Sequence, residues 1–122
     1  LAEIPQPEYQ QRRSLLPVLT GEAPPEQHRD FVRCEYFDAL DSLFTGGSGA
    51  FGTMYRDERH KLSVYHGKGV GELYDLDADP WEHQNLWDSD EHAALKHRLL
   101  AESFDAHVLL TTDVGSRRIA PM

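Results

Sequence analysis

The sequence predicts an α+β fold, in which a four-stranded antiparallel sheet packs against one C-terminal helix. Between residues 30 and 76, four short segments alternate apolar and polar side chains, which is typical of half-buried strands. After residue 88, apolar side chains recur at helical spacing along one longer segment. Because only turns or loops separate the four segments, we expect the strands to pair in chain order, as a meander.

The expected strands share this alternation, and they span residues 30–38, 51–56, 61–66 and 72–76. The last two strands are joined by a turn with three glycines, whose backbones adopt conformations that other residues avoid: Gly67, Gly69 and Gly71. Pro80 has no N–H to donate to a sheet, and its ring disfavours helical backbone at Asp79. Strand pairing should therefore end at this corner.

The C-terminal helix is expected to begin near Asp88 or Ser89, since either side chain can cap a helix. Asp90 and Glu91 would then lie in the first turn, where the helix dipole favours negative charge. The apolar residues at helical spacing are Leu95, Leu99, Leu100, Phe104 and Val108. A half-apolar sheet needs one face covered, so we expect the apolar side of the helix to lie on it.

Length and charge exclude several classes of protein. The 122 residues suit one domain, and their formal net charge of −9 comes with no basic run that could follow a phosphate backbone. We therefore expect no nucleic-acid partner. No apolar stretch approaches the roughly 20 residues of a membrane span, so no membrane partner is expected either. Because the chain begins with Leu1 rather than Met, we expect residues ahead of it, and the compartment stays unknown, with a cytoplasmic location favoured.

Cys34 is the one cysteine of the chain, which excludes an internal disulfide framework and a cysteine zinc cluster. It falls in the first expected strand. A free cysteine in such a place is typically a small buried residue, and we assign it no catalytic role.

Asp75, Asp77 and Asp79 form a D-x-D-x-D pattern that is similar to the start of a calcium-binding loop. Such a loop needs glycine at its sixth position and glutamate at its twelfth, where this chain has Pro80 and Leu86. We therefore expect a solvated turn in which aspartate side chains accept hydrogen bonds from nearby amides. The seven histidines show no paired spacing on one helical face, so no metal-binding residue is assigned.

Three strings in the second half of the chain carry a resemblance to a known family: Gly71-Glu72-Leu73-Tyr74-Asp75-Leu76, Asp79-Pro80-Trp81-Glu82 and Asn85-Leu86-Trp87. They resemble the C-terminal subdomain of the sulfatase family, in the alkaline phosphatase superfamily. Upstream, residues 13–22 look like the segment by which such enzymes leave their catalytic domain. Arg59-His60-Lys61-Leu62 sits where the family usually has Arg-Tyr-Lys-Leu. These matches follow the expected order over about four-fifths of the chain.

The resemblance implies a fragment of a larger enzyme that hydrolyses sulfate esters. Residues 1–22 would be the last piece of the catalytic domain with its linker, residues 23–110 the subdomain, and residues 111–122 a tail. The partner of the subdomain would be the catalytic domain, with a homo-oligomer as a further option. The apolar patch at residues 15–19 would also pack on that domain.

The resemblance also implies calcium and a formylglycine in the parent enzyme, the latter made within a Cys/Ser-x-Pro-x-Arg motif. Formylglycine hydrate would attack sulfur, while calcium and basic residues stabilise the developing charge. Cys34 is followed by Glu-Tyr-Phe-Asp, so neither the proline nor the arginine of the motif is present. We therefore assign no catalytic residue and no cofactor to this chain, and expect it to be inactive alone.

Cations gather where the second and third expected strands meet, and they are Arg56, Arg59, His60 and Lys61. A cationic loop tip that faces a cleft could bind an anionic sulfate ester, so these four are the candidates for a substrate rim. The alternative is an ordinary solvated hairpin tip, since charged residues are common at exposed turns.

Two further interpretations stay open. The chain could be a free-standing binding or oligomerisation module that no longer catalyses. The parent could also be a phosphodiester or phosphonate monoester hydrolase of the same superfamily, because sulfate and phosphoryl centres are similar in shape and charge. The upstream sequence separates the first of these from an enzyme, and paired rates on the two ester types separate the second.

Overall fold

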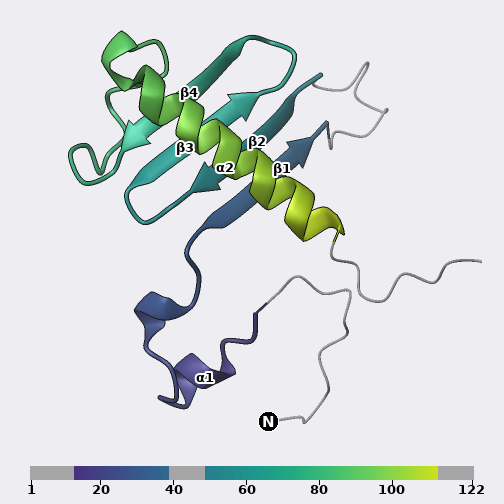
Figure 1. The fold of residues 1–122 in the computed structure, drawn as a ribbon, viewed down its shortest axis with the longest axis vertical. Helices are drawn as coiled ribbons and strands as arrows, with labels where there is room; N and C mark the ends of the chain where they lie inside the picture. Colours follow the sequence, from purple (N-terminus) through teal and green to yellow (C-terminus); the bar gives the residue numbers. More distant parts are fainter. Residues whose placement is uncertain (1–12, 39–48, 113–122) are drawn as a thin grey trace, which may run out of the picture. The chain divides into compact units, whose positions relative to one another are not determined.

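The computed structural model describes residues 13–38 and 49–112, and Figure 1 shows their fold. Four strands form one antiparallel sheet in chain order, which confirms the predicted meander. They are β1 (Val32–Phe37), β2 (Phe51–Arg56), β3 (His60–Tyr65) and β4 (Val70–Asp75). The predicted α+β class is also confirmed, because a long helix follows the sheet and crosses one of its faces.

This helix is α2 (Ala93–Thr112), and the short 3-10 helix η2 (Asp90–His92) leads into it. Ser89 precedes η2 in extended conformation, but its side chain caps no amide. Its Oγ instead lies 2.9 Å from His92 Nδ1. The helix therefore begins later than a cap at Asp88 or Ser89 predicts, because the 3-10 turn intervenes. In the described ranges no helix combines the length and the apolar character that crossing a membrane requires.

The chain divides into two units. Residues 29–103 form one, which contains the sheet, and the other contains α1 (Leu16–Leu19), η1 (Pro25–Gln27) and the part of α2 from Phe104. In the second unit the apolar patch is largely exposed, with Leu19 at 78%. The domain boundaries predicted at residues 22 and 110 stay predictions. Residues 1–12 of the predicted N-terminal piece and 113–122 of the predicted tail lie outside the described residues.

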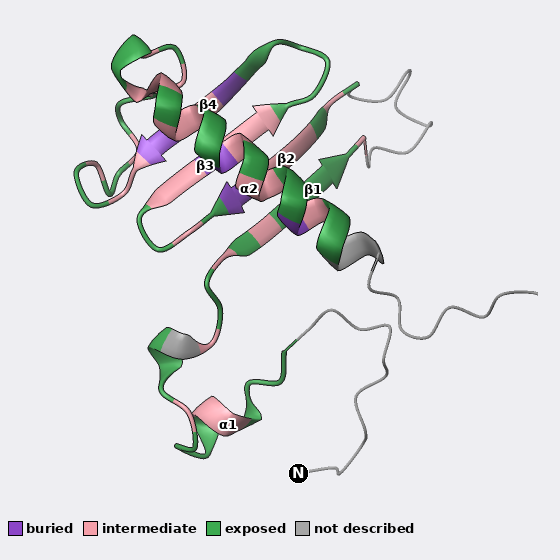
Figure 2. Cartoon of the chain, in the orientation of Figure 1, coloured by how far each residue is buried: buried purple, intermediate pink, exposed green. Residues whose placement is uncertain are grey.

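A row of three side chains across the sheet forms the core of the larger unit. Tyr55, Leu62 and Leu73 are register partners on β2, β3 and β4, and they are 6%, 1% and 0% exposed. Leu99 of α2 is also 0% exposed. Figure 2 shows these buried positions where the helix crosses the sheet. Helix and sheet thus bury a common apolar layer, as expected.

The predicted apolar side of α2 was only partly right. Leu99 is fully buried and Leu95 and Leu100 are half-buried, but Phe104 is 67% and Val108 38% exposed. Successive helical residues are rotated by about 100°, so Phe104 lies about 140° around the helix from Leu99. Ala106, which falls close to the line of Leu99, is buried instead. The sequence contained two apolar stripes, and only one of them faces the core.

The outer edge of β4 is covered by the segment that follows it, and Asn85 makes the key contacts. Its Oδ1 accepts hydrogen bonds from the Leu73 and Trp87 amides, both at 3.0 Å, and its Nδ2 donates to the Gly71 carbonyl at 3.1 Å. The Leu86 amide donates to the Leu73 carbonyl at 2.8 Å. Backbone groups of an edge strand that would otherwise need water are therefore satisfied within the chain.

The three glycines near the β3–β4 turn serve two different purposes. Gly67 and Gly69 have φ of 73° and 71°, which confirms their predicted role in the turn. Gly71 has no positive φ, so that role was wrong for it. A Cβ at Gly71 would lie 2.5 Å from Trp87 Cε3 and 2.6 Å from the Ser63 carbonyl oxygen. Glycine is needed there because the indole packs directly on the strand.

Leu99→Ala should lower the free energy of unfolding by about 2–5 kcal/mol, because it leaves a cavity in the buried layer. Phe104→Ala is the matched control and should change it by no more than about 0.5 kcal/mol, since the ring is exposed. Urea unfolding followed by circular dichroism measures both. Equal losses in the two variants would contradict the assignment of the buried stripe.

Candidate functional site

The four predicted rim residues lie together at the β2–β3 turn, but strand alternation sends them to different sides. Arg56 ends β2 and Lys61 is its register partner on β3, one position from the buried pair Tyr55 and Leu62. Both therefore lie on the face opposite α2. His60 lies on the helix side, and Arg59 is in the turn itself. The sequence placed the four in one cluster, whereas the structure divides them.

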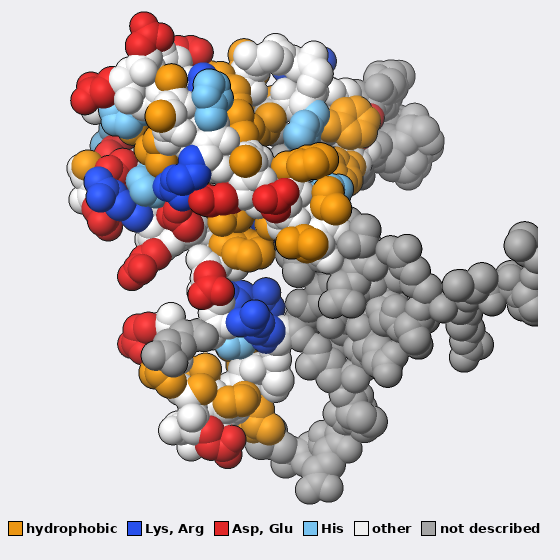
Figure 3. Space-filling model, viewed as in Figure 1, with side chains coloured by type: hydrophobic (Ala, Val, Ile, Leu, Met, Phe, Trp, Pro, Cys, Tyr) orange, Lys and Arg blue, Asp and Glu red, His pale blue; other side chains and the backbone are white. Residues whose placement is uncertain are grey.

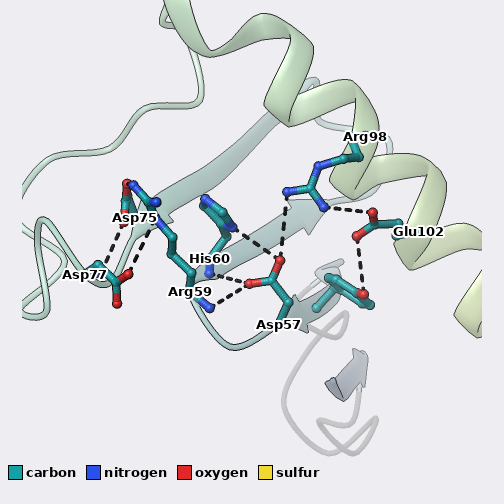
Figure 4. A network of polar contacts seen from close by, with 8 residues as sticks. Asp57, Arg59, His60, Asp75, Asp77, Arg98 and Glu102 are labelled. Atoms are coloured by element: carbon teal, nitrogen blue, oxygen red, sulfur yellow. Dashed lines mark hydrogen bonds and ion pairs between the residues drawn. The ribbon is translucent and has the colours of Figure 1, made fainter. Parts of the chain in front are cut away.

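Arg59 is engaged in an ion pair. Its Nε and Nη2 donate to the two carboxylate oxygens of Asp75 at 3.0 and 2.5 Å, and Asp77 lies 3.7 Å away (Figure 4). The guanidinium holds the pKa of Asp75 well below its usual range. Asp75 Oδ1 also accepts the amides of Asp77 and Ala78 at 3.2 and 3.3 Å. The carboxylate thus fixes the turn after β4, as expected for side chains that bond nearby amides.

His60 belongs to a second network, which joins the β2–β3 turn to α2 (Figure 4). Asp57 accepts the Arg59 amide at 2.8 Å, and its Oδ2 lies 3.2 Å from His60 Nδ1 and 4.0 Å from Arg98. Burial acts to raise the pKa of Asp57, but the amides of His60 and Arg59 outweigh it, and the pKa is lowered. Arg98 in turn donates to Glu102 at 2.8 Å.

Lys61 is also paired. Its Nζ lies 2.5 Å from Glu82 Oε2 and 5.9 Å from the centre of the Tyr74 ring. Glu82 has φ of 58°, which is uncommon for a residue with a side chain. Arg56 differs from the other three candidates: it is exposed, and its guanidinium has no hydrogen bond or ion pair with the described residues. Of the predicted rim, Arg56 is therefore the cation best placed to meet an external anion.

Mixed charge surrounds this turn. On the face seen in Figure 3, basic and acidic side chains alternate around the β2–β3 turn, at the left of the view. Within residues 13–38 and 49–112, no three His, Cys, Asp or Glu side chains gather as metal ligands would. The Asp75 carboxylate is occupied by Arg59 and two amides, so the residues of this turn do not fit a calcium ion.

The sheet face opposite α2 is the second notable surface. It carries large side chains that are partly exposed, among them Val32 at 44%, Tyr36 at 42%, Tyr65 at 40% and Val70 at 54%. Cys34 lies on this face and is exposed, so the prediction of a buried residue was wrong. Strand alternation turns it away from the helix, and no described element covers it. A hollow of about 170 Å³ opens beside it.

Comparison with known proteins shows one family match and several structural relatives. Residues 1–107 match the family described as N-sulphoglucosamine sulphohydrolase, C-terminal. A solved 2-O GAG sulfatase shares 24% identity with a TM-score of 0.71, over 96% of this chain and 24% of that one. A structure solved with its substrate D-glucosamine-2-N,6-O-disulfate shares 23% identity with a TM-score of 0.70, over 94% and 23%.

The phosphonate monoester hydrolase SpPMH from Silicibacter pomeroyi shares 29% identity with a TM-score of 0.66, over 88% of this chain and 22% of that one. A search of curated proteins found no match. The chain thus spans about a quarter of the length of the solved structures that it matches.

Asp75→Asn should destabilise the chain near neutral pH, and this loss of stability should become smaller as the pH falls below 3.8. A carboxylate with a lowered pKa stabilises the fold above its unfolded value of 3.8, and that contribution is lost as pH falls toward the folded value. Urea unfolding at pH 7 and pH 3 measures the difference. Asp77→Asn is the control, because its carboxylate is 72% exposed. A stability difference between Asp75→Asn and the unmodified chain that is as large at pH 3 as at pH 7 would contradict this account.

Proposed function

The chain belongs to the N-sulphoglucosamine sulphohydrolase C-terminal family, and we propose that it is the C-terminal subdomain of a hydrolase that cleaves sulfuric esters. The observation that carries the proposal is the family match over residues 1–107. The fold supports it, since a 2-O GAG sulfatase and the structure solved with D-glucosamine-2-N,6-O-disulfate both match nearly the whole chain. Those structures have about three quarters of their length outside the matched part, and we propose that the reaction takes place there.

The parent enzyme would carry calcium and a formylglycine in its catalytic domain. When present, formylglycine hydrate supplies the nucleophile, and calcium stabilises negative charge on the ester. This chain does not fit either group: Cys34 lacks the Pro and Arg of the motif, and Asp75 is held by Arg59. Its own residues would therefore support and shape the active site without taking part in the reaction.

We propose two roles for this chain within the enzyme. The first is to cover part of the catalytic domain with the sheet face opposite α2. An open, partly apolar sheet face is a surface that proteins normally cover. The second is to form one side of the substrate pocket through the cations at the β2–β3 turn, of which Arg56 is exposed and the others are paired.

The substrate class would be an anionic ester, and the structural relatives favour a sulfated sugar. One relative is described as a 2-O GAG sulfatase, and another was solved with its substrate D-glucosamine-2-N,6-O-disulfate. A second candidate is a phosphonate monoester, because two phosphonate monoester hydrolases share higher identity, 29% and 27%, although over less of this chain. Either anion suits an arginine at the pocket rim.

The sequence upstream of Leu1 in the native gene product tests the proposal. A longer chain with a Cys/Ser-x-Pro-x-Arg motif supports it, whereas a gene product that starts near Leu1 overturns it. With the longer protein, rates on paired sulfate and phosphonate esters then separate the two candidates. We expect the sulfate ester to give the higher kcat/KM, and the reverse result would favour the second candidate.

Arg56→Ala in the longer protein should raise KM for an anionic ester by up to about tenfold, equal to 1.4 kcal/mol, with little change in kcat. The reason is that a cation at the pocket rim attracts the bound ester and its transition state equally. Lys68→Ala is the matched control, since this exposed cation lies in the β3–β4 turn, at the other end of the hairpin. Similar effects of the two variants on KM would show that only general charge matters.

A further inference from the structure

Gly52 of β2 has neither a positive φ, as Gly67 and Gly69 have, nor a close neighbour, as Gly71 has. Its φ is not in the left-handed region, and a Cβ built there would be 3.9 Å from its nearest described neighbours, Tyr65 Cδ1 and the Val64 carbonyl. That is ordinary van der Waals contact. Glycine weakens a strand, and within one it often marks a place where another molecule approaches closely. Nothing in the described residues needs the missing side chain to be absent.

The absence of a side chain creates the hollow on the face opposite α2. Gly52 is the register partner of Tyr36 on β1 and of Tyr65 on β3, so two tyrosines stand on either side of it. Cys34, Met54 and Ser63 form the next row of the lining, and the volume is about 170 Å³. A cavity of about 150 Å³ holds a benzene ring, so there is room for one large apolar side chain.

We propose that this hollow is the anchor pocket of the interface with the catalytic domain, and that it receives one leucine-sized or phenylalanine-sized side chain from it. This inference rests on the proposed function. Large apolar anchors that fill central pockets contribute much of the binding energy of protein interfaces. The lining contains no Lys or Arg, so an anionic ester finds no counter-charge there.

A second copy of this chain is a poorer occupant than the catalytic domain. Each copy carries a formal net charge of −9, so two copies repel each other when they face. The structural relatives, in contrast, contain about three quarters of their length outside the region matched here, which is ample for a covering domain. The pocket is also bordered by exposed Val70 and Val32 on the same face, as an interface core requires.

Thiol labelling of Cys34 tests the proposal, because this cysteine lines the hollow and is exposed in the 122-residue chain. We expect a maleimide to label Cys34 rapidly in this chain and at least tenfold more slowly in the longer gene product, as read by peptide mass spectrometry. Gly52→Leu in the longer product should fill the pocket, displace the anchor and restore rapid labelling. Gly52→Ala should have a smaller effect, since it occupies less of the volume.

Stability of the 122-residue chain provides the control. Gly52→Ala and Gly52→Leu should leave its Tm unchanged or raised, because a side chain has room there and suits a strand better than glycine. Gly71→Ala should lower the Tm, since its Cβ meets Trp87. A Tm lowered by Gly52→Ala as much as by Gly71→Ala would show that the domain itself needs this glycine, and would overturn the inference.

The outcomes separate the inference from the proposed function. Rapid labelling of Cys34 in a longer product that hydrolyses esters would overturn the anchor pocket and leave the function intact. Protection of Cys34 in the 122-residue chain that increases with its concentration would identify a second copy as the occupant, and would also overturn the proposal. A gene product without an upstream domain would contradict both the anchor pocket and the proposed function.

Discussion

The carboxamide of Asn85 is the group on which the arrangement of β4 and α2 depends. It accepts from two amides and donates to one carbonyl, so it joins the edge strand to the start of the connection that leads to the helix. The same bonds place the Trp87 indole over Gly71, where no side chain could stand. Lys96 of α2 then donates to the Trp87 carbonyl at 2.6 Å and lies 4.8 Å from the ring centre. Edge, connection and helix are therefore held by one chain of contacts.

Several polar residues near this connection also have structural roles. Asp75 and Arg59 hold two turns together, and Asp79 accepts the Gln84 amide at 2.7 Å, so these carboxylates of the D-x-D-x-D pattern bond the backbone, as the sequence predicts. The amides of Gln84 and His83 lower the pKa of Asp79, which keeps it charged in that role. The D-x-D-x-D pattern thus holds the fold of the subdomain together.

The sequence predicted the sheet well because the signals for strands are local. Alternation and turn residues predicted every end of the four strands to within two residues, and the strand order followed from the connections in chain order. The helix face was predicted less well, because Leu99 and Phe104 have equal hydrophobicity and only the position of the sheet chooses between them. The candidate site shows the same limit. Sequence could gather Arg56, Arg59, His60 and Lys61, but it could not pair them. Asp57 is a near neighbour of His60, whereas Asp75 and Glu82 reach Arg59 and Lys61 from segments 16 and 21 residues away.

Glycine shows why a residue type alone does not reveal its purpose. Gly67 and Gly69 serve backbone conformation, Gly71 serves packing, and Gly52 serves neither within the described residues. Only the surroundings of a missing Cβ separate these cases, and they are set by tertiary contacts that no local pattern encodes. A glycine without an internal reason is therefore evidence about what lies outside a domain. In this chain it lies on the one sheet face that α2 leaves open, beside Tyr36 and Tyr65, which is where a covering domain would have to make contact.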